Sequence, residues 1–238
     1  NRPDFRRRGS FRLDRRPVDA LKWGFRYGEK IMRESDPRQE LINAARQFYQ
    51  LGWMVGTAGN LSAKSSQESF WITASGKSKG NLTENDFVQV NLAGEVLDFV
   101  APANKPSAET SIHQAIYGLF PEARAVYHVH SVEANLVSGF AAEGELKMPP
   151  LEMLKGLGLW VENPQVVMPV FQNYLEVPRI AQEIRERFGK KPSDIPALLI
   201  INHGVTVWAN STTQALHHLE IVEYIFRYLV AKLNTRGF

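Results

Sequence analysis

AVYHVHS, residues 125–131, is a short apolar stretch that carries two histidines two positions apart. Its β-branched and aromatic residues predict a β-strand. Successive side chains of a strand point to opposite faces, so His128 and His130 are expected on the same face. Neutral imidazole is the commonest protein ligand of metal ions, and two on one strand face can bind one ion. The pair therefore suggests a metal site, although two half-buried histidines bonded to backbone carbonyls would give the same local pattern.

The composition limits both the class of protein and the kind of metal site. With 238 residues, 44% of them hydrophobic, the chain is long enough for one large domain with its own core. It contains no cysteine, so disulfides, thiolate catalysis and cysteine-bound zinc are excluded, and any metal must be bound by His, Asp or Glu. No apolar run reaches the length of a membrane span, and the N-terminus lacks the apolar segment of a secretory signal. We therefore expect a cytoplasmic protein that does not bind membranes.

Positive charge is concentrated in the first 36 residues. Eleven of the 28 Lys and Arg residues but only six of the 25 acidic residues lie there, so this segment carries +5 and the rest of the chain −2. Such a segment could contact nucleic acid. Its arginines form no groove-reading motif and few aromatics are interleaved with them, so we expect a basic N-terminal extension and no nucleic-acid partner. The folded domain is expected at residues 37–238.

Two glycine-rich segments, residues 52–60 and 74–80, are candidates for a pair of anion-binding loops. A predicted helix that begins near Asp36 precedes the first segment, and predicted strands at 61–64 and 69–73 separate the two. Glycine lets backbone N–H groups turn outward and approach a ligand closely. Together the segments suggest a phosphate cradle, whereas each alone is better explained as an ordinary hairpin connection. Neither matches the Walker pattern, so a nucleoside triphosphate site is not supported.

The stretch Lys-Pro-Ser-Ala-Glu, residues 105–109, leads into a helix predicted over residues 110–120. Ser107 and Glu109 are thus expected at or near a helix N-terminus, where N–H groups and the macrodipole favour anions. Glu109 either complements the dipole or faces the metal as a ligand or base, since this helix leads directly into the strand with the two histidines. His113, one turn into the helix, is interpreted as structural.

Two residues further along the chain complete the candidate set. Glu152 is a single acid among apolar neighbours in PPLEMLKG, residues 149–156. A carboxyl in such surroundings is expected to be desolvated, with a raised pKa that suits proton transfer near neutral pH. The alternative is a surface carboxylate on a turn. His203 follows a strongly apolar strand predicted at 197–201 and precedes a glycine. It supplies a third imidazole that could join His128 and His130.

Helices and strands alternate along the remaining chain without an internal repeat or a linker. This intermixing predicts an α/β fold with a mainly antiparallel or mixed sheet and helices on both faces. The further elements expected are a strand pair at 87–91 and 95–98, strands at 166–170 and 205–208, and helices at 132–138, 177–188 and from Ser211 onward.

Five motifs, in their order and spacing, resemble the class II aldolase/adducin superfamily over residues 38–232: the Gly-Asn loop, the Ala-Ser-Gly turn, Lys-Pro-Ser-Ala-Glu, His-x-His and Asn-His-Gly. The resemblance implies a three-layer α/β/α fold with a mixed, mostly antiparallel central sheet, and a homotetramer with sites near subunit boundaries. It implies one zinc ion per subunit, bound by His128, His130 and His203. It also implies a pocket for the phosphate of a small sugar phosphate, formed by Gly59, Asn60, Ser75, Gly76 and Ser107.

Within the superfamily, the stretches GWMVGTAGNLS, WITASGKSKG, HVHSVEANLVS and PPLEMLKG are most similar to the methylthioribulose-1-phosphate dehydratase branch. That similarity implies a zinc-dependent lyase of methionine salvage. Such an enzyme removes water from 5-methylthioribulose 1-phosphate to give 2,3-diketo-5-methylthiopentyl 1-phosphate. Glu152 would then be the general acid/base, and Glu109 a fourth zinc ligand or a second proton carrier.

Two other functions compete with this one. A zinc-dependent class II sugar-phosphate aldolase would use Glu109 as its base, but the aldolases have a second serine where this chain has Ala108. A non-catalytic adducin-like scaffold would lack the metal histidines, and all three are present here. The basic segment 1–36 matches nothing in the superfamily.

Overall fold

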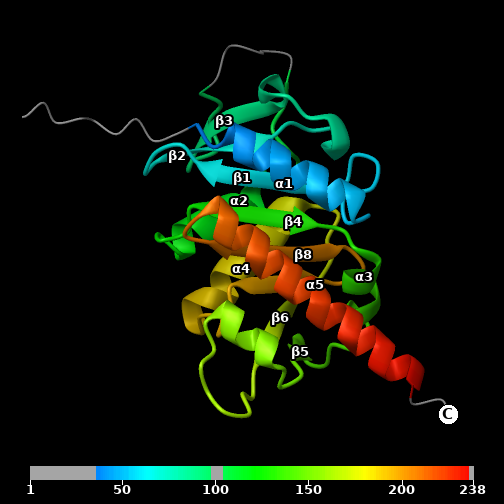
Figure 1. The fold of residues 1–238 in the computed structure, drawn as a ribbon. Helices are drawn as coiled ribbons and strands as arrows, with labels where there is room; N and C mark the ends of the chain where they lie inside the picture. The colour runs from blue at the N-terminus through cyan, green and yellow to red at the C-terminus, as the bar shows by residue number, and fades with distance from the viewer. Residues whose placement is uncertain (1–35, 98–103, 236–238) are drawn as a thin grey trace, which may run out of the picture. The chain divides into compact units, whose positions relative to one another are not determined.

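One central sheet organises the part of the chain that the computed structural model describes, residues 36–97 and 104–235 (Figure 1). The strands are β1 (Asn60–Lys64), β2 (Ser69–Thr73), β3 (Phe87–Asn91), β4 (Ala125–Val129), β5 (Glu145–Lys147), β6 (Val167–Phe171), β7 (Ala197–Ile200) and β8 (Gly204–Ala209). Across the sheet they follow the order β3-β2-β1-β4-β8-β7-β6-β5. Among these described strands, neighbours run antiparallel except β6 and β7, which are parallel.

Helices cover both faces of the sheet and complete three layers. They are α1 (Arg38–Gln50), α2 (Thr110–Leu119), α3 (Val132–Ser138), α4 (Val177–Lys190) and α5 (Thr212–Asn234), with short 3-10 turns η1 (Lys79–Asn81), η2 (Glu84–Asp86) and η3 (Glu152–Leu157). Side chains of α1, α3 and α5 share one core with one face of the sheet, and those of α2 and α4 share a second core with the other. Figure 1 shows α1 and α5 together in front of the sheet. The predicted α/β/α fold with a mostly antiparallel sheet is confirmed.

Strand β4 is fully enclosed at the centre of the sheet. It pairs with β1 on one side and β8 on the other, and all five of its residues are buried. Val126 belongs to the core beneath α2 and α4, and Tyr127 to the core beneath α1 and α5. This burial on both faces explains the nearly continuous apolar run that the sequence shows here. The register pairs His128 with Asn60 of β1 and with Thr206 of β8, so three polar residues form a row across the sheet.

The structure differs from the predicted elements in two places. Residues 95–97 form no strand, because Val96 makes only an isolated bridge to Val90. The backbone N–H of Asn91 donates to the carbonyl oxygen of Glu95 at 3.0 Å and that of Leu97 to Gln89 at 2.8 Å, so the described residues pair with β3 around this one bridge. Conversely, the short edge strand β5 was not predicted, since two of its three residues are charged and give no strand signal.

The basic N-terminal segment lies outside the described residues except for Asp36. The Asp36 carboxylate accepts a hydrogen bond from the backbone N–H of Arg38 at 3.0 Å, whereas the N-cap residue of α1 is Pro37, which makes no side-chain cap. The other predictions for residues 1–36 stay predictions. In residues 36–97 and 104–235, no helix combines the length and the apolar character needed to cross a bilayer.

One carboxyl group, that of Glu223, is almost completely buried. Glu223 of α5 is 3% exposed, and neither of its carboxyl oxygens has a hydrogen-bond partner among the described residues. Burial raises the pKa of Glu223 to about 8, because an apolar environment disfavours the charged form. The side chain is therefore mostly neutral at pH 7.

This buried carboxyl makes stability depend on pH. Between its ordinary pKa of 4.5 and its folded-state pKa of about 8, the folded chain holds a proton that the unfolded chain has released. Stability therefore falls as the pH rises through this window, by up to about 1.4 kcal/mol per pH unit. We expect Glu223→Gln to raise the thermal unfolding temperature at pH 8 and to change it little at pH 5. Glu162→Gln, at an exposed position, is the control, and equal gains for Glu223→Gln at both pH values would contradict the prediction.

Candidate metal centre

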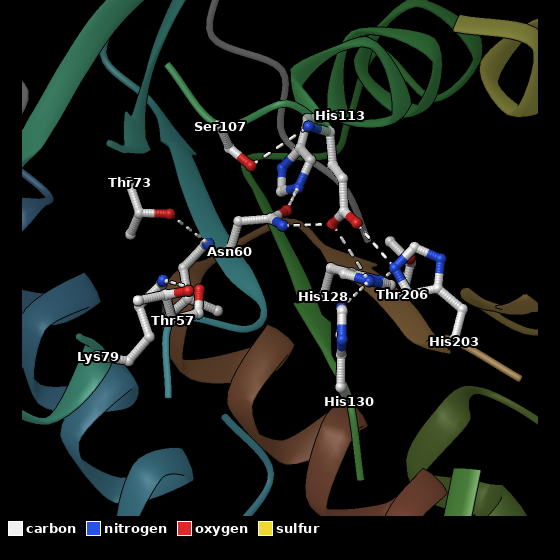
Figure 2. Close-up of polar contacts among 12 residues, drawn as sticks. Thr57, Asn60, Thr73, Lys79, Ser107, His113, His128, His130, His203 and Thr206 are labelled. Carbon is white, nitrogen blue, oxygen red and sulfur yellow. Dashed lines mark hydrogen bonds and ion pairs between the residues drawn. The ribbon is translucent and has the colours of Figure 1, made fainter. Parts of the chain in front are cut away.

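Four side chains from three separate stretches of the sequence converge at one end of β4. His128, His130, His203 and Glu109 each offer one ligand atom, and these atoms lie within 4.8 Å of one another. Nε2 of His128 is 2.9 Å from Nε2 of His130 and 3.3 Å from Oε2 of Glu109, and Nε2 of His203 is 2.8 Å from Oε1 of Glu109. Figure 2 shows the three labelled imidazoles turned toward one another. The third imidazole expected from the sequence is therefore brought to the first two.

Close backbone packing fixes where the third histidine lies. His203 is in the turn between β7 and β8, and Gly204 begins β8 directly after it. A Cβ on Gly204 would lie 2.1 Å from the carbonyl oxygen of Val129, so only glycine lets β8 start this close to β4. Asn202, just before the histidine, has φ of +50°, in the left-handed region that asparagine tolerates better than most residues. In the Asn-His-Gly motif, Asn202 and Gly204 thus meet the needs of the backbone, and His203 supplies the candidate ligand.

Glu109 reaches the histidines from the N-terminus of α2. It is the residue directly before the helix, and its side chain is only 13% exposed. Its carboxylate contacts His128 and His203 and accepts a hydrogen bond from the side-chain amide of Asn60. Of the two alternatives that the sequence left open, the geometry supports the one in which Glu109 faces the metal site.

The charge states of these groups suit a cation. Burial alone would raise the pKa of Glu109, but His128, His203 and the Asn60 amide together outweigh burial and lower the pKa, so the carboxylate is ionised. Burial lowers the pKa of His128 well below its ordinary value and the pKa of His130 to about 4. Both rings are therefore neutral at pH 7, and each has a bare nitrogen to offer a metal.

The donor set and its orientation fit a zinc-like ion. Three imidazole nitrogens and one carboxylate oxygen are ligands that zinc and similar borderline ions prefer. Nδ1 of His128 lies 2.8 Å from Oγ1 of Thr206, so the neutral ring can donate from Nδ1 and turn its bare Nε2 into the cluster. The alternative in which the pair bonds backbone carbonyls does not apply, since His128 contacts Thr206 and His130 instead.

A cavity of about 170 Å³ lies beside the cluster. It is lined by Glu109 and His130 and by parts of both glycine-rich segments. All five residues that the resemblance implies for a phosphate pocket line this cavity: Gly59, Asn60, Ser75, Gly76 and Ser107. The structure therefore brings the two segments together, as a phosphate cradle requires. A larger hollow of about 600 Å³ between β5 and the C-terminal part of α5 has no histidine in its lining.

Lys79 is a candidate functional residue that the sequence did not reveal. Its side chain is 2% exposed and lines the same cavity. Nζ donates hydrogen bonds of 2.8 Å to the carbonyl oxygens of Thr57 and Lys77, one in each glycine-rich segment. Burial lowers the pKa of Lys79 to about 8, with Glu109 opposing the shift. Lys77 lies two positions away in the same polar segment, and its Nζ pairs with Oδ1 of Asp86 at 3.0 Å. The sequence alone could not tell which of the two lysines is buried.

Glu152 is not brought to the cluster within this chain. It begins η3, its side chain is 76% exposed, and Oε1 lies 3.5 Å from Nζ of Lys155. The expectation of a desolvated carboxyl is wrong for the single chain, because the apolar neighbours Leu154 and Leu157 enter the core while Glu152 faces solvent. The surface carboxylate that the sequence left as the alternative is what the chain shows.

Known proteins resemble this chain along nearly the whole of its described length. The model of the Class II Aldolase and Adducin N-terminal domain matches residues 39–230. A methylthioribulose-1-phosphate dehydratase from Microcystis aeruginosa is 70% identical over 202 residues, which cover 85% of this chain and 98% of that protein. A methylthioribulose-1-phosphate dehydratase from Leptospira biflexa is 43% identical over 202 residues, which cover 82% of this chain and 97% of that protein.

Solved structures show the same fold. A putative aldolase/epimerase/decarboxylase from Escherichia coli matches with a TM-score of 0.68 and 28% identity, over 82% of this chain and 88% of that chain. L-fuculose-1-phosphate aldolase from Thermus thermophilus matches with a TM-score of 0.67 and 22% identity, over 84% of this chain and 95% of that chain, and supports the fold alone. The resemblance inferred from the five sequence motifs is confirmed, and the chain belongs to the class II aldolase and adducin family.

Proposed function

We propose that the chain is a zinc-dependent methylthioribulose-1-phosphate dehydratase of methionine salvage, acting in the cytoplasm. It would remove water from 5-methylthioribulose 1-phosphate and release 2,3-diketo-5-methylthiopentyl 1-phosphate. The observation that carries the proposal is the convergence of three imidazole nitrogens and the Glu109 carboxylate beside a cavity lined by two glycine-rich segments. The names of the relatives at 70% and 43% identity are the reason for choosing this substrate. Residues 37–238 would form the catalytic domain, and residues 1–36 an extension of it.

The metal-binding residues would be His128, His130 and His203, with Glu109 as the fourth donor. Zinc bound there would supply Lewis-acid polarisation of the substrate carbonyl at carbon 2, which makes the hydrogen on carbon 3 more acidic. Glu109 suits the role of a ligand because it is ionised and is held by two histidines and by the Asn60 amide.

The two glycine-rich segments would hold the substrate phosphate. Gly59 and Gly76 offer close approach to backbone N–H groups, and Ser75 and Ser107 offer hydroxyl groups. We add Lys79 to this set, because its buried ammonium lines the same cavity and has no carboxylate within ion-pair distance in the described part of the chain. A held phosphate orients carbons 2 to 4 against the metal site, so binding energy is converted into reaction geometry.

Glu152 would move the proton. Water loss requires that the hydrogen on carbon 3 be taken as a proton and that the hydroxyl on carbon 4 leave with a proton, after which the enol becomes a diketone. Because Glu152 is exposed and outside the cluster in its own chain, we propose that it serves the metal site of a neighbouring copy. This requires an assembly with sites at subunit boundaries, for which we propose a homotetramer.

A class II sugar-phosphate aldolase is the second candidate, because Glu109 lies in the cluster where a base would be needed. Incubating the purified protein separately with 5-methylthioribulose 1-phosphate and with L-fuculose 1-phosphate distinguishes the two candidates. Water loss from the first without cleavage of the second supports the dehydratase. Cleavage of the second without water loss from the first would replace the dehydratase by the aldolase.

The first prediction concerns the metal. The reconstituted protein should contain about one equivalent of zinc per chain, bound by four protein side chains. His203→Ala should lose it, because one of the three imidazoles is removed. His217→Ala, on the exposed face of α5, should keep the zinc content of the parent. Elemental analysis after dialysis measures both, and a parent protein without stoichiometric zinc would contradict the site.

The second prediction concerns Glu152. Glu152→Gln should keep its zinc and lose on the order of 10²–10⁴-fold in dehydration rate, because a positioned proton carrier is removed. Mixing Glu152→Gln subunits with His203→Ala subunits should restore part of the activity that neither has alone, since some mixed sites combine an intact metal cluster with an intact Glu152. Glu162→Gln, in the neighbouring exposed loop, is the matched control. Parent-like turnover in Glu152→Gln would remove this residue from the mechanism, and no recovery on mixing would contradict its action on a neighbouring copy.

The third prediction concerns Lys79. Lys79→Met should raise the KM for the phosphorylated substrate by about 10-fold or more, because a charge-assisted hydrogen bond to phosphate is lost. Lys77→Met should leave KM near the parent value, because the Lys77 side chain pairs with Asp86 and does not line the cavity. Calorimetric titration with inorganic phosphate gives an independent measure. Equal phosphate affinity in Lys79→Met and the parent would show that the lysine only ties the two segments together.

A further inference from the structure

A chain of hydrogen-bonded side chains leads away from Glu109 into the protein interior. Asn60 contacts the Glu109 carboxylate, His113 contacts Asn60, Ser62 contacts His113, and Tyr117 contacts Ser62. The four side chains beyond Glu109 are buried, with exposed fractions between 0% and 3%. Two come from β1 and two from α2, and Figure 2 shows Asn60 next to the ring of His113.

The distances in this chain are those of strong hydrogen bonds. Oδ1 of Asn60 lies 2.6 Å from Nε2 of His113, and Nδ1 of His113 lies 2.6 Å from Oγ of Ser62. Oγ of Ser62 lies 2.8 Å from the hydroxyl oxygen of Tyr117. Both ring nitrogens of His113 are therefore used, and its interpretation as an ordinary structural residue is incomplete.

The placement of the Asn60 amide determines which atom donates in the first two steps. Asn60 presents its NH₂ group to Oε2 of Glu109 and its oxygen to Nε2 of His113, which agrees with a metal-binding carboxylate that only accepts. An amide oxygen also only accepts, so Nε2 of His113 must carry a hydrogen. The orientation of an asparagine amide is normally ambiguous, and here its two partners remove the ambiguity.

The remaining donors follow from the neutrality of the ring. Burial lowers the pKa of His113 to about 4, although Glu109 opposes the shift, so at pH 7 the ring has a single hydrogen. With that hydrogen on Nε2, Nδ1 is bare and Ser62 must donate to it. The Ser62 oxygen then accepts from Tyr117, whose pKa is raised by burial and which keeps its proton. Every hydrogen in the chain thus points toward Glu109.

We propose that His113 is a positioning residue for the metal centre. By donating from Nε2 it holds the oxygen of Asn60, so that the Asn60 NH₂ group faces Glu109 and keeps the carboxylate aimed at His128 and His203. Without this donor the amide is free to turn its oxygen toward the carboxylate, where two acceptors repel. The inference rests on the metal role of Glu109 in the proposed function, but not on the substrate or the reaction.

The tautomer of His113 can be read in the unaltered, zinc-free protein. Two-dimensional ¹H–¹⁵N NMR of the histidine side chains should show His113 with a hydrogen on Nε2 and a bare Nδ1, unchanged between pH 6 and pH 8. His217, exposed on α5, serves as the reference signal of a solvent-accessible ring. A hydrogen on Nδ1 of His113, or a doubly protonated ring at pH 7, would overturn the proposed order of donors.

Two substitutions at one position then separate positioning from packing. His113→Gln retains an amide donor that can reach the Asn60 oxygen, whereas His113→Leu fills similar space without a donor. Groups that orient a metal ligand are typically worth roughly 10–100-fold in metal affinity, so His113→Leu should lose about that factor in zinc affinity. His113→Gln should stay within about threefold of the parent. Competition with a chelator of known affinity measures zinc binding without any substrate.

Tyr117→Phe is the matched control, because it removes only the donor farthest from Glu109. It should keep the parent zinc affinity. A folded His113→Leu with parent affinity, or equal losses in the Gln and Leu variants, would overturn the positioning role. If His113→Leu fails to fold, the Gln variant and the tautomer measurement still decide the question. A protein that binds zinc and shows the expected tautomer but does not dehydrate methylthioribulose 1-phosphate would leave this inference intact and refute the proposed function.

Discussion

The antiparallel register of β4 with its two neighbours is the constraint on which the site depends. It places Asn60, His128 and Thr206 in one row across three strands. Thr206 orients the imidazole of His128 from one side, and Asn60 holds the Glu109 carboxylate on the other. Because side chains alternate between faces, a slip of one residue in either pairing would move these groups to the opposite face of the sheet. Ligand orientation is therefore set by backbone hydrogen bonds rather than by the ligands themselves.

The cluster is costly to bury without a cation. An ionised Glu109 beside the neutral, desolvated rings of His128 and His130 is largely out of water, and a charge in such surroundings needs a close partner. The rest of the fold supplies hydrogen bonds but no Lys or Arg within ion-pair distance of Glu109 in the described residues. A divalent cation is the partner that would satisfy both the carboxylate and the bare ring nitrogens.

The sequence predicted the features that depend on local periodicity. The period of two in AVYHVHS gave the shared face of His128 and His130, and the turn after an apolar strand gave His203. The layer architecture followed from the alternation of helices and strands. Local patterns suggested a phosphate cradle and a proton-transferring Glu152, whereas the five individual pocket residues and the dehydration came from the resemblance.

What the sequence missed depends on packing between distant segments. Lys77 and Lys79 look alike in the chain, but only Lys79 is covered when the two glycine-rich segments meet. His113 looks like a helical core residue until β1 is placed against α2, where Asn60 and Ser62 meet its two ring nitrogens. Glu152 has apolar neighbours in sequence, yet these turn into the core and leave the carboxylate in solvent. In each case burial, and not residue type, determines the role.

Asn60 joins the two halves of the site. Its backbone ends the first glycine-rich segment, directly after Gly59, and its side chain bridges His113 and Glu109. A Cβ on Gly59 would lie 2.8 Å from the carbonyl oxygen of His128, so this segment also packs against β4 itself. Lys79 in turn connects this segment to the second one through two carbonyl oxygens. The cavity and the metal cluster therefore share one hydrogen-bonded framework, and the groups that would bind phosphate and cation are held in place before either arrives, which is the condition for efficient electrostatic catalysis.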